Sequence, residues 1–305
     1  MHQIILVRSQ SRRNAASSHE ALAKRASRLG ARQQRPTDNF AGVQICAMNR
    51  LRPSNGLGDL NQCDWSRRHS FPAPHAAIRA YHCFIAGNLR DITIIASTSR
   101  WVVINKPPGV LSVPGRLQEN HACAASWCRE HFPHASGPIT VHRLDMDTSG
   151  LLLMALDADA HRNLSRQFES RTIGKSYVAI VAGHITADSG DINVPMRPDL
   201  TNRPYQIIDP VQGKPAQTHF TVARRSEHVR PDDARMDVTA ITLLPHTGRS
   251  HQLRVHCRHI GHPILGDVLY GDSAAAPRLL LHARTLAFDD PDTGDRIELI
   301  CEAEF

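Results

Sequence analysis

A chain of 305 residues, 41% of them hydrophobic and 5% aromatic, can form one large domain or two smaller ones with an ample core. Its seven cysteines include no C-x-x-C pair and no regular framework, which argues for reduced thiols and against a disulfide scaffold or a zinc ribbon. No apolar run approaches the roughly 20 residues that cross a bilayer, so we expect a cytoplasmic protein without a membrane segment.

The net charge of +7 is concentrated at the N-terminal end of the chain. Residues 1–90 contain 14 Lys and Arg against 4 Asp and Glu, which leaves 22 basic and 25 acidic residues, a formal charge of −3, for residues 91–305. If residues 91–305 bind a nucleic acid, they must do so through a local cluster of arginines and not through bulk charge.

Residues 1–90 lack sustained periodicity, and we predict a basic, mostly disordered N-terminal extension. One short helix is expected here, because Ser17 and Glu20 fit a capping box and Gly30 ends the apolar pattern. The composition leaves two alternatives open, an arm that touches RNA and an organellar transit peptide.

The pattern changes near residue 91, where we place the start of a folded domain that runs to residue 305. Two short strands are predicted at 92–95 and 101–104, then helical composition at 121–132 and a buried strand at 151–156. Asp157 can cap a helix that continues to about Ser170. These elements do not alternate as regular βαβ units, so they predict an α+β domain with a largely antiparallel sheet. Further strands are predicted at 177–181, 218–224, 237–244, 279–282 and 296–300.

The strongest chemical signal is the stretch 141–150, Val-His-Arg-Leu-Asp-Met-Asp-Thr-Ser-Gly. Asp145 lies in a loop shortly before the buried strand, so packing can hold its carboxylate in a partly desolvated pocket. Such a carboxylate suits a nucleophile or a general base. Asp147 is equally acidic and stands only two residues away, so the residues by themselves leave both candidates open.

A second cluster spans residues 247–256, where Gly248 permits a tight turn into a helix. On this helix His251 and Arg254 share one face, and the guanidinium could pair with a buried carboxylate from elsewhere in the chain and keep it ionised. The tract also invites a metal site, but its spacings match no zinc signature, and we expect none. The metal-ligating side chains in question are His251, His256, Cys257, His259 and His262.

These stretches together resemble the RluA-type pseudouridine synthases. His142–Asp145 with Thr148–Gly150 is similar to that family's catalytic signature, 175–179 to its tyrosine motif and 248–256 to its arginine motif. The resemblance covers residues 92–305 in collinear order. Three further stretches narrow it to compact, dual-specificity members that act on tRNA anticodon stem-loops and large-subunit ribosomal RNA; these are 105–116, 202–218 and 261–283.

The resemblance implies a pseudouridine synthase fold with a central catalytic cleft, and an isomerase that detaches uracil, rotates it and rejoins it through C5. It selects Asp145 over Asp147 as the catalytic residue, with Arg254 as the charge partner of Asp145 and Tyr177 against the base. Arg143 would fill the stack that the flipped base leaves. A monomer without cofactor or metal is expected. Two alternatives stay open, a catalytically silent RNA-binding protein of this fold and a metal-dependent enzyme built on the histidines. The other expected RNA contacts are His142, Lys106, Arg116, Arg203 and Arg249.

Overall fold

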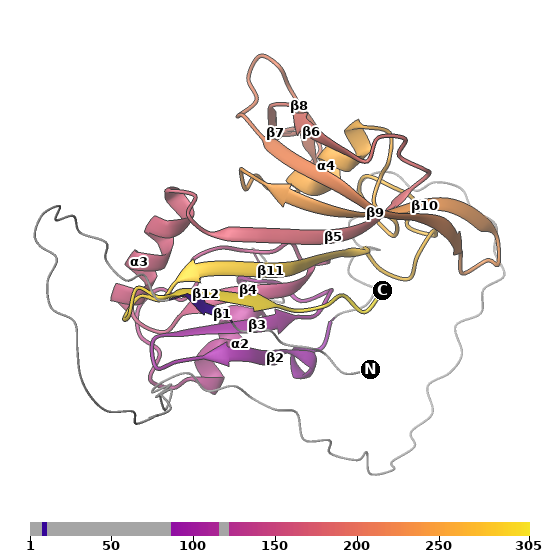
Figure 1. The fold of residues 1–305 in the computed structure, drawn as a ribbon. Coiled ribbons are helices and arrows are strands. Elements are labelled where there is room, and N and C mark those ends of the chain that lie inside the picture. Colours follow the sequence, from indigo (N-terminus) through magenta and orange to yellow (C-terminus); the bar gives the residue numbers. More distant parts are fainter. Residues whose placement is uncertain (1–7, 11–86, 116–121) are drawn as a thin grey trace, which may run out of the picture.

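The computed structural model describes residues 8–10, 87–115 and 122–305, and these form a long twisted sheet with helices packed against it (Figure 1). The helical elements are η2 (Leu89–Asp91), α2 (Ala124–His131), α3 (Ala158–Glu169) and α4 (Gln252–His259). The strands are β1 (Arg8–Gln10), β2 (Thr93–Ser97), β3 (Trp101–Lys106), β4 (Ser149–Ala155), β5 (Gly174–Ala182), β6 (Ser189–Asn193), β7 (Met196–Pro198), β8 (Gln206–Ile208), β9 (Gln217–Val229), β10 (Arg235–Pro245), β11 (Leu281–Asp289) and β12 (Arg296–Ile300).

The main sheet has the order β2-β3-β4-β11-β5-β10-β9-β6, and β12 pairs with β11 and with β1. Only the β4–β11 pair is parallel among the described strands, and every other pair is antiparallel. This topology confirms the predicted α+β class with a largely antiparallel sheet. Strand β5 pairs with both β11 and β10, so it joins the two halves of the sheet that are visible in Figure 1.

The half that contains β2, β3, β4 and β11 is built on β4, whose seven residues are all buried. A continuous apolar strand of this kind must be covered on both faces. One face packs into a cluster that includes Leu164 of α3, together with Trp101 and Phe288, whose rings meet edge to face at 5.0 Å. The other face packs against Trp127 of α2. Because β4 is fixed from both sides, the loop that immediately precedes it has a rigid foundation.

The half that contains β9, β10 and α4 has a smaller core. Helix α4 contributes Leu253 and Cys257 to a cluster with Leu243 of β10 and Ile264. The turn between β10 and α4 therefore faces back toward β5, which runs along the junction of the two halves (Figure 1). None of the helices within the described residues is long and apolar enough to pass through a membrane.

The predicted elements within 91–305 are present, and most boundaries differ by a few residues. The strand predicted at 279–282 is the exception, because it overlaps β11 only at the first two residues of β11, which continues to Asp289. The strand at 296–300 and the helix capped by Asp157 match the prediction, and the Asp157 carboxylate accepts bonds from the backbone N–H groups of Asp159 and Ala160. Strands β6, β7 and β8 were not predicted, because they are short and mix polar with apolar residues. Three residues of the predicted extension form β1, while the helix expected after Ser17 lies outside the described residues.

Candidate active site

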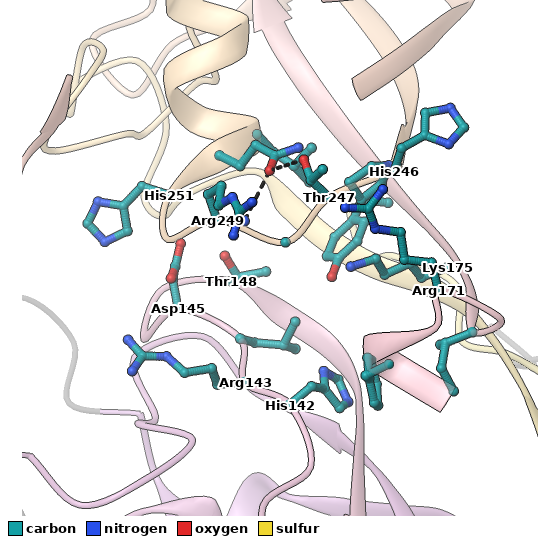
Figure 2. Close-up of a pocket in the computed structure, with 18 of the residues that line it drawn as sticks. His142, Arg143, Asp145, Thr148, Arg171, Lys175, His246, Thr247, Arg249 and His251 are labelled. Carbon is teal, nitrogen blue, oxygen red and sulfur yellow. Dashed lines mark hydrogen bonds between the residues drawn. The ribbon is translucent and has the colours of Figure 1, made fainter. Parts of the chain in front are cut away.

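A cavity of about 690 Å³ lies at the junction of the two halves of the sheet (Figure 2). Its walls come from three segments that are far apart in sequence: the loop before β4, the turn from α3 into β5, and the turn from β10 into α4. The cavity contains most of the motif residues singled out from the sequence. Its charged and titratable lining comprises His142, Arg143, Asp145, Glu169, Arg171, Lys175, Tyr177, His246, Arg249, His251 and Arg254.

The loop that carries Asp145 is fixed through the backbone on both sides of this residue. Before Asp145, the Ser112 hydroxyl donates to the Leu144 carbonyl (2.7 Å) and accepts from the Leu144 N–H (3.0 Å). After it, the Met146 carbonyl accepts from the Gly109 N–H (2.9 Å) and from the Lys106 ammonium (2.8 Å). These bonds position the carboxylate without contacting it, so the side chain itself is available to a substrate.

Lys106 was predicted to contact RNA, and the structure contradicts this prediction. Its side chain is 0% exposed, and its Nζ also donates to the carbonyls of Pro107 (2.9 Å) and Val110 (2.8 Å). Burial lowers its pKa to about 7, against the opposing effect of the Asp147 and Asp145 charges. An ammonium enclosed by three carbonyls cannot reach a phosphate, so Lys106 holds the Asp145 loop and does not bind the RNA backbone.

The structure separates the two candidate carboxylates. Asp145 lines the cavity, and its charge raises the pKa of both Tyr177 and His251, in each case as a smaller effect than burial. Asp147 is not part of the cavity lining, and its charge acts on the buried Lys106. Asp145 is therefore the carboxylate that a molecule in the cavity would meet.

Tyr177 lies on β5 and lines the same cavity. Burial raises the pKa of its phenol above the ordinary value, and the nearby Asp145 charge adds to this effect. The phenol therefore stays protonated at neutral pH and can donate a hydrogen bond. Lys175 precedes it by two residues, so the two side chains share one face of the strand.

Arg254 is bound to a carboxylate that the sequence did not suggest as its partner. Its Nε donates to Asp267 Oδ2 (2.8 Å) and its terminal nitrogen to Oδ1 (2.6 Å), with side chains 2% and 0% exposed. Asp267 also accepts from the N–H groups of Leu269 and Tyr270. Arg254 lines the cavity together with Asp145, so the prediction that it orients Asp145 stays a prediction, while the buried pair is with Asp267.

The remaining predicted RNA contacts have different positions. Arg143 is exposed at the cavity wall, and Arg249 lines the cavity while its Nε donates to the Pro215 carbonyl (3.2 Å). The His142 ring stacks on Phe168, and its Nε2 accepts from the Leu153 N–H (2.9 Å). Burial lowers the His142 pKa to about 3, so this ring is neutral. Arg203 is exposed but outside the cavity lining, and Arg116 lies outside the described residues.

Three basic residues of the cavity were not predicted: Arg171, Lys175 and His246. Figure 2 shows them on the opposite side of the cavity from Arg143. Lys175 lies just before the strand predicted at 177–181 and within the observed β5, so extending the alternation of that strand back from Tyr177 could have revealed it. Arg171 and His246 lie on turns, where periodicity carries no information about direction.

The histidines of the tract 251–262 have different surroundings. His256 is fully buried, His259 is exposed, and His262 donates through Nδ1 to the Ala182 carbonyl at 2.7 Å. His251 is bound through Nδ1 to the Tyr270 hydroxyl. Across residues 8–10, 87–115 and 122–305, no three metal-ligating side chains gather closely enough to hold an ion.

Comparison with known proteins agrees with this geometry. A family model described as RNA pseudouridylate synthase matches residues 100–259. The dual-specificity RNA pseudouridine synthase RluA of Yersinia pestis is 45% identical over 207 residues, 67% of this chain and 95% of the relative. The protein of that name from Escherichia coli (strain K12) is 42% identical over 217 residues, 70% of this chain and 94% of the relative.

A solved structure gives the same result for the fold. Human RNA pseudouridylate synthase domain containing 1 superposes with a TM-score of 0.58 at 30% identity, over 72% of this chain and 85% of that one. The fold class and the reaction that the motifs predicted are thereby confirmed. This chain belongs to the RluA family of pseudouridine synthases and is an RNA-modifying isomerase.

Proposed function

We propose that this enzyme isomerises a loop uridine in a tRNA anticodon stem-loop, in large-subunit ribosomal RNA, or in both. The similarity to relatives named as dual-specificity enzymes supports this substrate class. A loop uridine also suits the chemistry, because the target base must leave its stack and less pairing is broken in a loop than in a helix. Action in the cytoplasm, as a monomer, is part of this proposal.

Asp145 is the catalytic carboxylate in this proposal. The observation that carries it is the rigid loop, bonded through Leu144 and Met146, that presents the Asp145 side chain to a cavity with cationic walls. The carboxylate acts on the ribose of the flipped uridine, either as a nucleophile or as the base that removes a ribose proton. The N-glycosidic bond then breaks, the uracil rotates, and a bond forms from C5 with loss of the C5 proton.

Tyr177 on β5 and Arg254 on α4 both line the cavity and support this chemistry. Tyr177 packs against the base and assists removal of the C5 proton. Arg254, held rigidly by Asp267, supplies a fixed positive charge in the cavity lining that it shares with Asp145, and it orients that carboxylate. Because the pair with Asp267 is bidentate, the direction of the guanidinium is set before the RNA binds.

The cationic walls bind the RNA backbone around the flipped nucleotide. Arg143, Arg171 and Lys175 line the cavity, and no hydrogen bond or ion pair to a carboxylate is found for them within the described residues. Arg143 stands two residues before Asp145, so its planar guanidinium can occupy the vacated stack while Asp145 receives the base. The local cluster replaces the bulk positive charge that residues 91–305 lack.

Release of tritium from RNA labelled with [5-³H]uridine tests the activity, because only an enzyme that rejoins uracil through C5 displaces this hydrogen. Chemical mapping of pseudouridines in RNA from a deletion strain, with and without the restored gene, identifies the uridine. Tritium release with restored sites in an anticodon loop or in ribosomal RNA supports the proposal. If tritium is released but no site is restored in either RNA class, the proposed substrate class is wrong although the protein is an active enzyme.

A further inference from the structure

Two residues of the cavity have a backbone conformation that their side chains disfavour. The described chain has three non-glycine residues with positive φ: Arg171 (59°), His251 (54°) and Asp233 (62°). Arg171 and His251 line the cavity, whereas Asp233 is exposed in the turn between β9 and β10. The left-handed region is costly for residues with a Cβ, and aspartate and histidine tolerate it better than arginine does.

Arg171 occupies a position that glycine usually takes. Helix α3 ends in a Schellman motif, in which the Arg171 N–H bonds to the Phe168 carbonyl (3.3 Å) and the Thr172 N–H to the Gln167 carbonyl (3.0 Å). The left-handed residue of this motif is glycine in most helices because glycine has no Cβ to clash. Here the position carries a long cationic side chain that enters the cavity and has no carboxylate partner within the described residues.

His251 departs from local preference in two ways. It directly precedes α4, where Ser, Thr, Asp or Asn normally caps the helix, and its side chain makes no capping bond. Its backbone is also left-handed. The side chain instead bonds through Nδ1 to the Tyr270 hydroxyl at 2.7 Å. Neither local structure nor helix capping accounts for a histidine at this position.

The Tyr270 bond is compatible with a neutral imidazole whose hydrogen lies on Nε2. The Tyr270 hydroxyl accepts from the Gln206 N–H (2.8 Å), so its own hydrogen is available for His251 Nδ1. If Tyr270 donates to Nδ1, the neutral ring carries its hydrogen on Nε2. Burial lowers the His251 pKa, which favours this neutral form, while the Asp145 charge opposes the effect. The Nε2–H group is then a donor on the wall that His251 shares with Asp145.

We propose that Arg171 and His251 contact the RNA directly, Arg171 at a backbone phosphate and His251 through Nε2–H at the uridine beside Asp145. The need for these two side chains in the cavity keeps both residues in a conformation better suited to glycine. At functional sites a residue can keep a strained backbone conformation when its side chain contributes more to function than the strain costs in stability. The inference rests on Asp145 as the catalytic carboxylate.

Glycine substitution at all three left-handed positions separates function from structure. Arg171→Gly and the control Asp233→Gly relieve the same strain, so both are expected to keep or raise the Tm. His251→Gly also loses the bond to Tyr270, so its Tm and activity are compared with those of Tyr270→Phe, which loses the same bond but keeps the imidazole. For Asp233→Gly we expect unchanged activity. For the two cavity variants we expect kcat/KM to fall about tenfold or more, the effect of losing one hydrogen bond to a charged or polar partner.

The two cavity variants should lose activity at different steps, Arg171→Gly in RNA binding and His251→Gly in the chemical step. With total [5-³H]uridine-labelled RNA from an Escherichia coli strain lacking its RluA, Arg171→Gly should raise KM and lower the salt dependence of binding by about one phosphate contact. His251→Gly should lower kcat in single-turnover tritium release while RNA affinity holds. Arg171→Lys and His251→Gln, which keep a cation and a donor, should recover part of each loss.

The same series contains the outcomes that would overturn the inference. Wild-type kcat/KM in both cavity glycine variants would mean that neither side chain contacts the RNA. For Arg171→Gly, loss of activity together with a lower Tm would mean that the residue acts through the fold. For His251, an equal loss of activity in Tyr270→Phe would mean the same. Asp145→Asn, assayed beside them, judges the catalytic carboxylate separately, since activity in that variant would contradict the proposed function and not the contacts of Arg171 and His251.

Discussion

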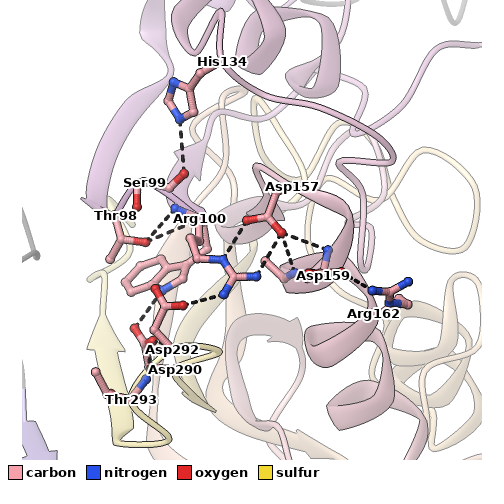
Figure 3. A network of polar contacts seen from close by, with 12 residues as sticks. Thr98, Ser99, Arg100, His134, Asp157, Asp159, Arg162, Asp290, Asp292 and Thr293 are labelled. Atoms are coloured by element: carbon pink, nitrogen blue, oxygen red, sulfur yellow. Dashed lines mark hydrogen bonds and ion pairs between the residues drawn. The ribbon is translucent and has the colours of Figure 1, made fainter.

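The basic residues of this enzyme fall into two environments. Far from the cavity, Arg100 donates to Asp157 (2.8 Å) and Asp292 (2.5 Å) in the network of Figure 3, and the two carboxylates raise its pKa. At the cavity, Arg143 and Lys175 have no carboxylate partner within the described residues. The same kind of side chain stabilises the fold where acids surround it and is available to RNA where they do not.

The comparison also explains why bulk charge misleads for this chain. Residues 91–305 carry a formal charge of −3, yet many of their acids are bound to arginines away from the cavity. Near the cavity the balance reverses, because Asp145 and Glu169 are the only carboxylates in its lining among the described residues. Distribution of charge, and not its sum, therefore sets where RNA can bind.

The largest expected effect separates the two neighbouring carboxylates. Asp145→Asn should lower single-turnover tritium release on the order of 10³-fold or more, because the amide is neither a nucleophile nor a base. Its RNA affinity should stay near that of the wild type, since no phosphate contact is lost. Asp147→Asn, outside the cavity lining, is the matched control and should retain activity. The reverse ranking of the two variants would contradict the site.

The buried Arg254–Asp267 pair should contribute more to the free energy of unfolding than an exposed ion pair does. Asp267→Asn leaves the Arg254 charge buried without its carboxylate and should cost about 3–5 kcal/mol. Glu302→Gln breaks a bidentate pair with Arg284 that is partly exposed, and should cost less than about 1 kcal/mol. Urea denaturation of both variants measures the difference. Equal losses would show that burial does not distinguish the two pairs.

Paired and unpaired cations should respond oppositely to substitution. Lys175→Gln should weaken RNA binding several-fold and reduce the salt slope by about one contact, with little change in Tm. Arg100→Gln should leave RNA binding unchanged and lower stability by about 1 kcal/mol, through the lost Asp157 pair. RNA-binding titrations of both variants at several salt concentrations measure the two salt slopes. If Arg100→Gln also lowered the salt slope, the contrast drawn from the ion pairs would be wrong.

Acid should destabilise the fold through three histidines whose pKa burial lowers, and one of them is His142, with a pKa of about 3. Burial lowers the pKa of His256 and of His282 from 6.5 to about 4. The unfolded chain therefore binds more protons between these values, so stability falls as the pH drops from 6.5 to 4, by at most about 1.4 kcal/mol per unit per histidine. Above pH 6.5 these groups contribute no pH dependence. Urea denaturation of His256→Leu should show a shallower slope in this window, and an unchanged slope would exclude His256 as a cause.

The smallest effect is expected from removing the basic extension. A shortened protein that begins at Asn88 keeps every cavity residue within the described structure and should retain kcat/KM within about twofold, because the local cluster binds the RNA. It loses the β1 pairing with β12, so a small decrease in Tm is expected. A several-fold rise in KM would assign RNA binding to residues 1–87.

The sequence was most informative where structure is locally determined. The apolar run of β4 and the Asp157 cap predicted their elements, and the motif around Asp145 predicted the cavity. Lys106 was misassigned because a lysine is usually exposed, and its burial depends on the Asp145 loop folding back onto the end of β3. Pairings of this kind join residues 40 positions apart and leave no local pattern.

The partner of Arg254 could not be predicted for a similar reason. Asp267 follows it by 13 residues, and the two meet only because the turn after α4 folds under the helix. The left-handed backbone of Arg171 and His251 could not be predicted, because residue type does not determine φ. Local patterns therefore identified the motif and two candidate carboxylates, and the family resemblance selected Asp145. Tertiary packing decided which neighbours reach it.

Site-resolved mapping in cells tests the central claim most directly. A strain lacking this gene receives either the wild-type gene or Asp145→Asn, and pseudouridines are mapped in its transfer and ribosomal RNA. We expect loop uridines that are unmodified in the deletion strain to become pseudouridine with the wild type and to stay uridine with Asp145→Asn. Restoration of the same sites by Asp145→Asn would contradict the account, as would a wild-type gene that restores none.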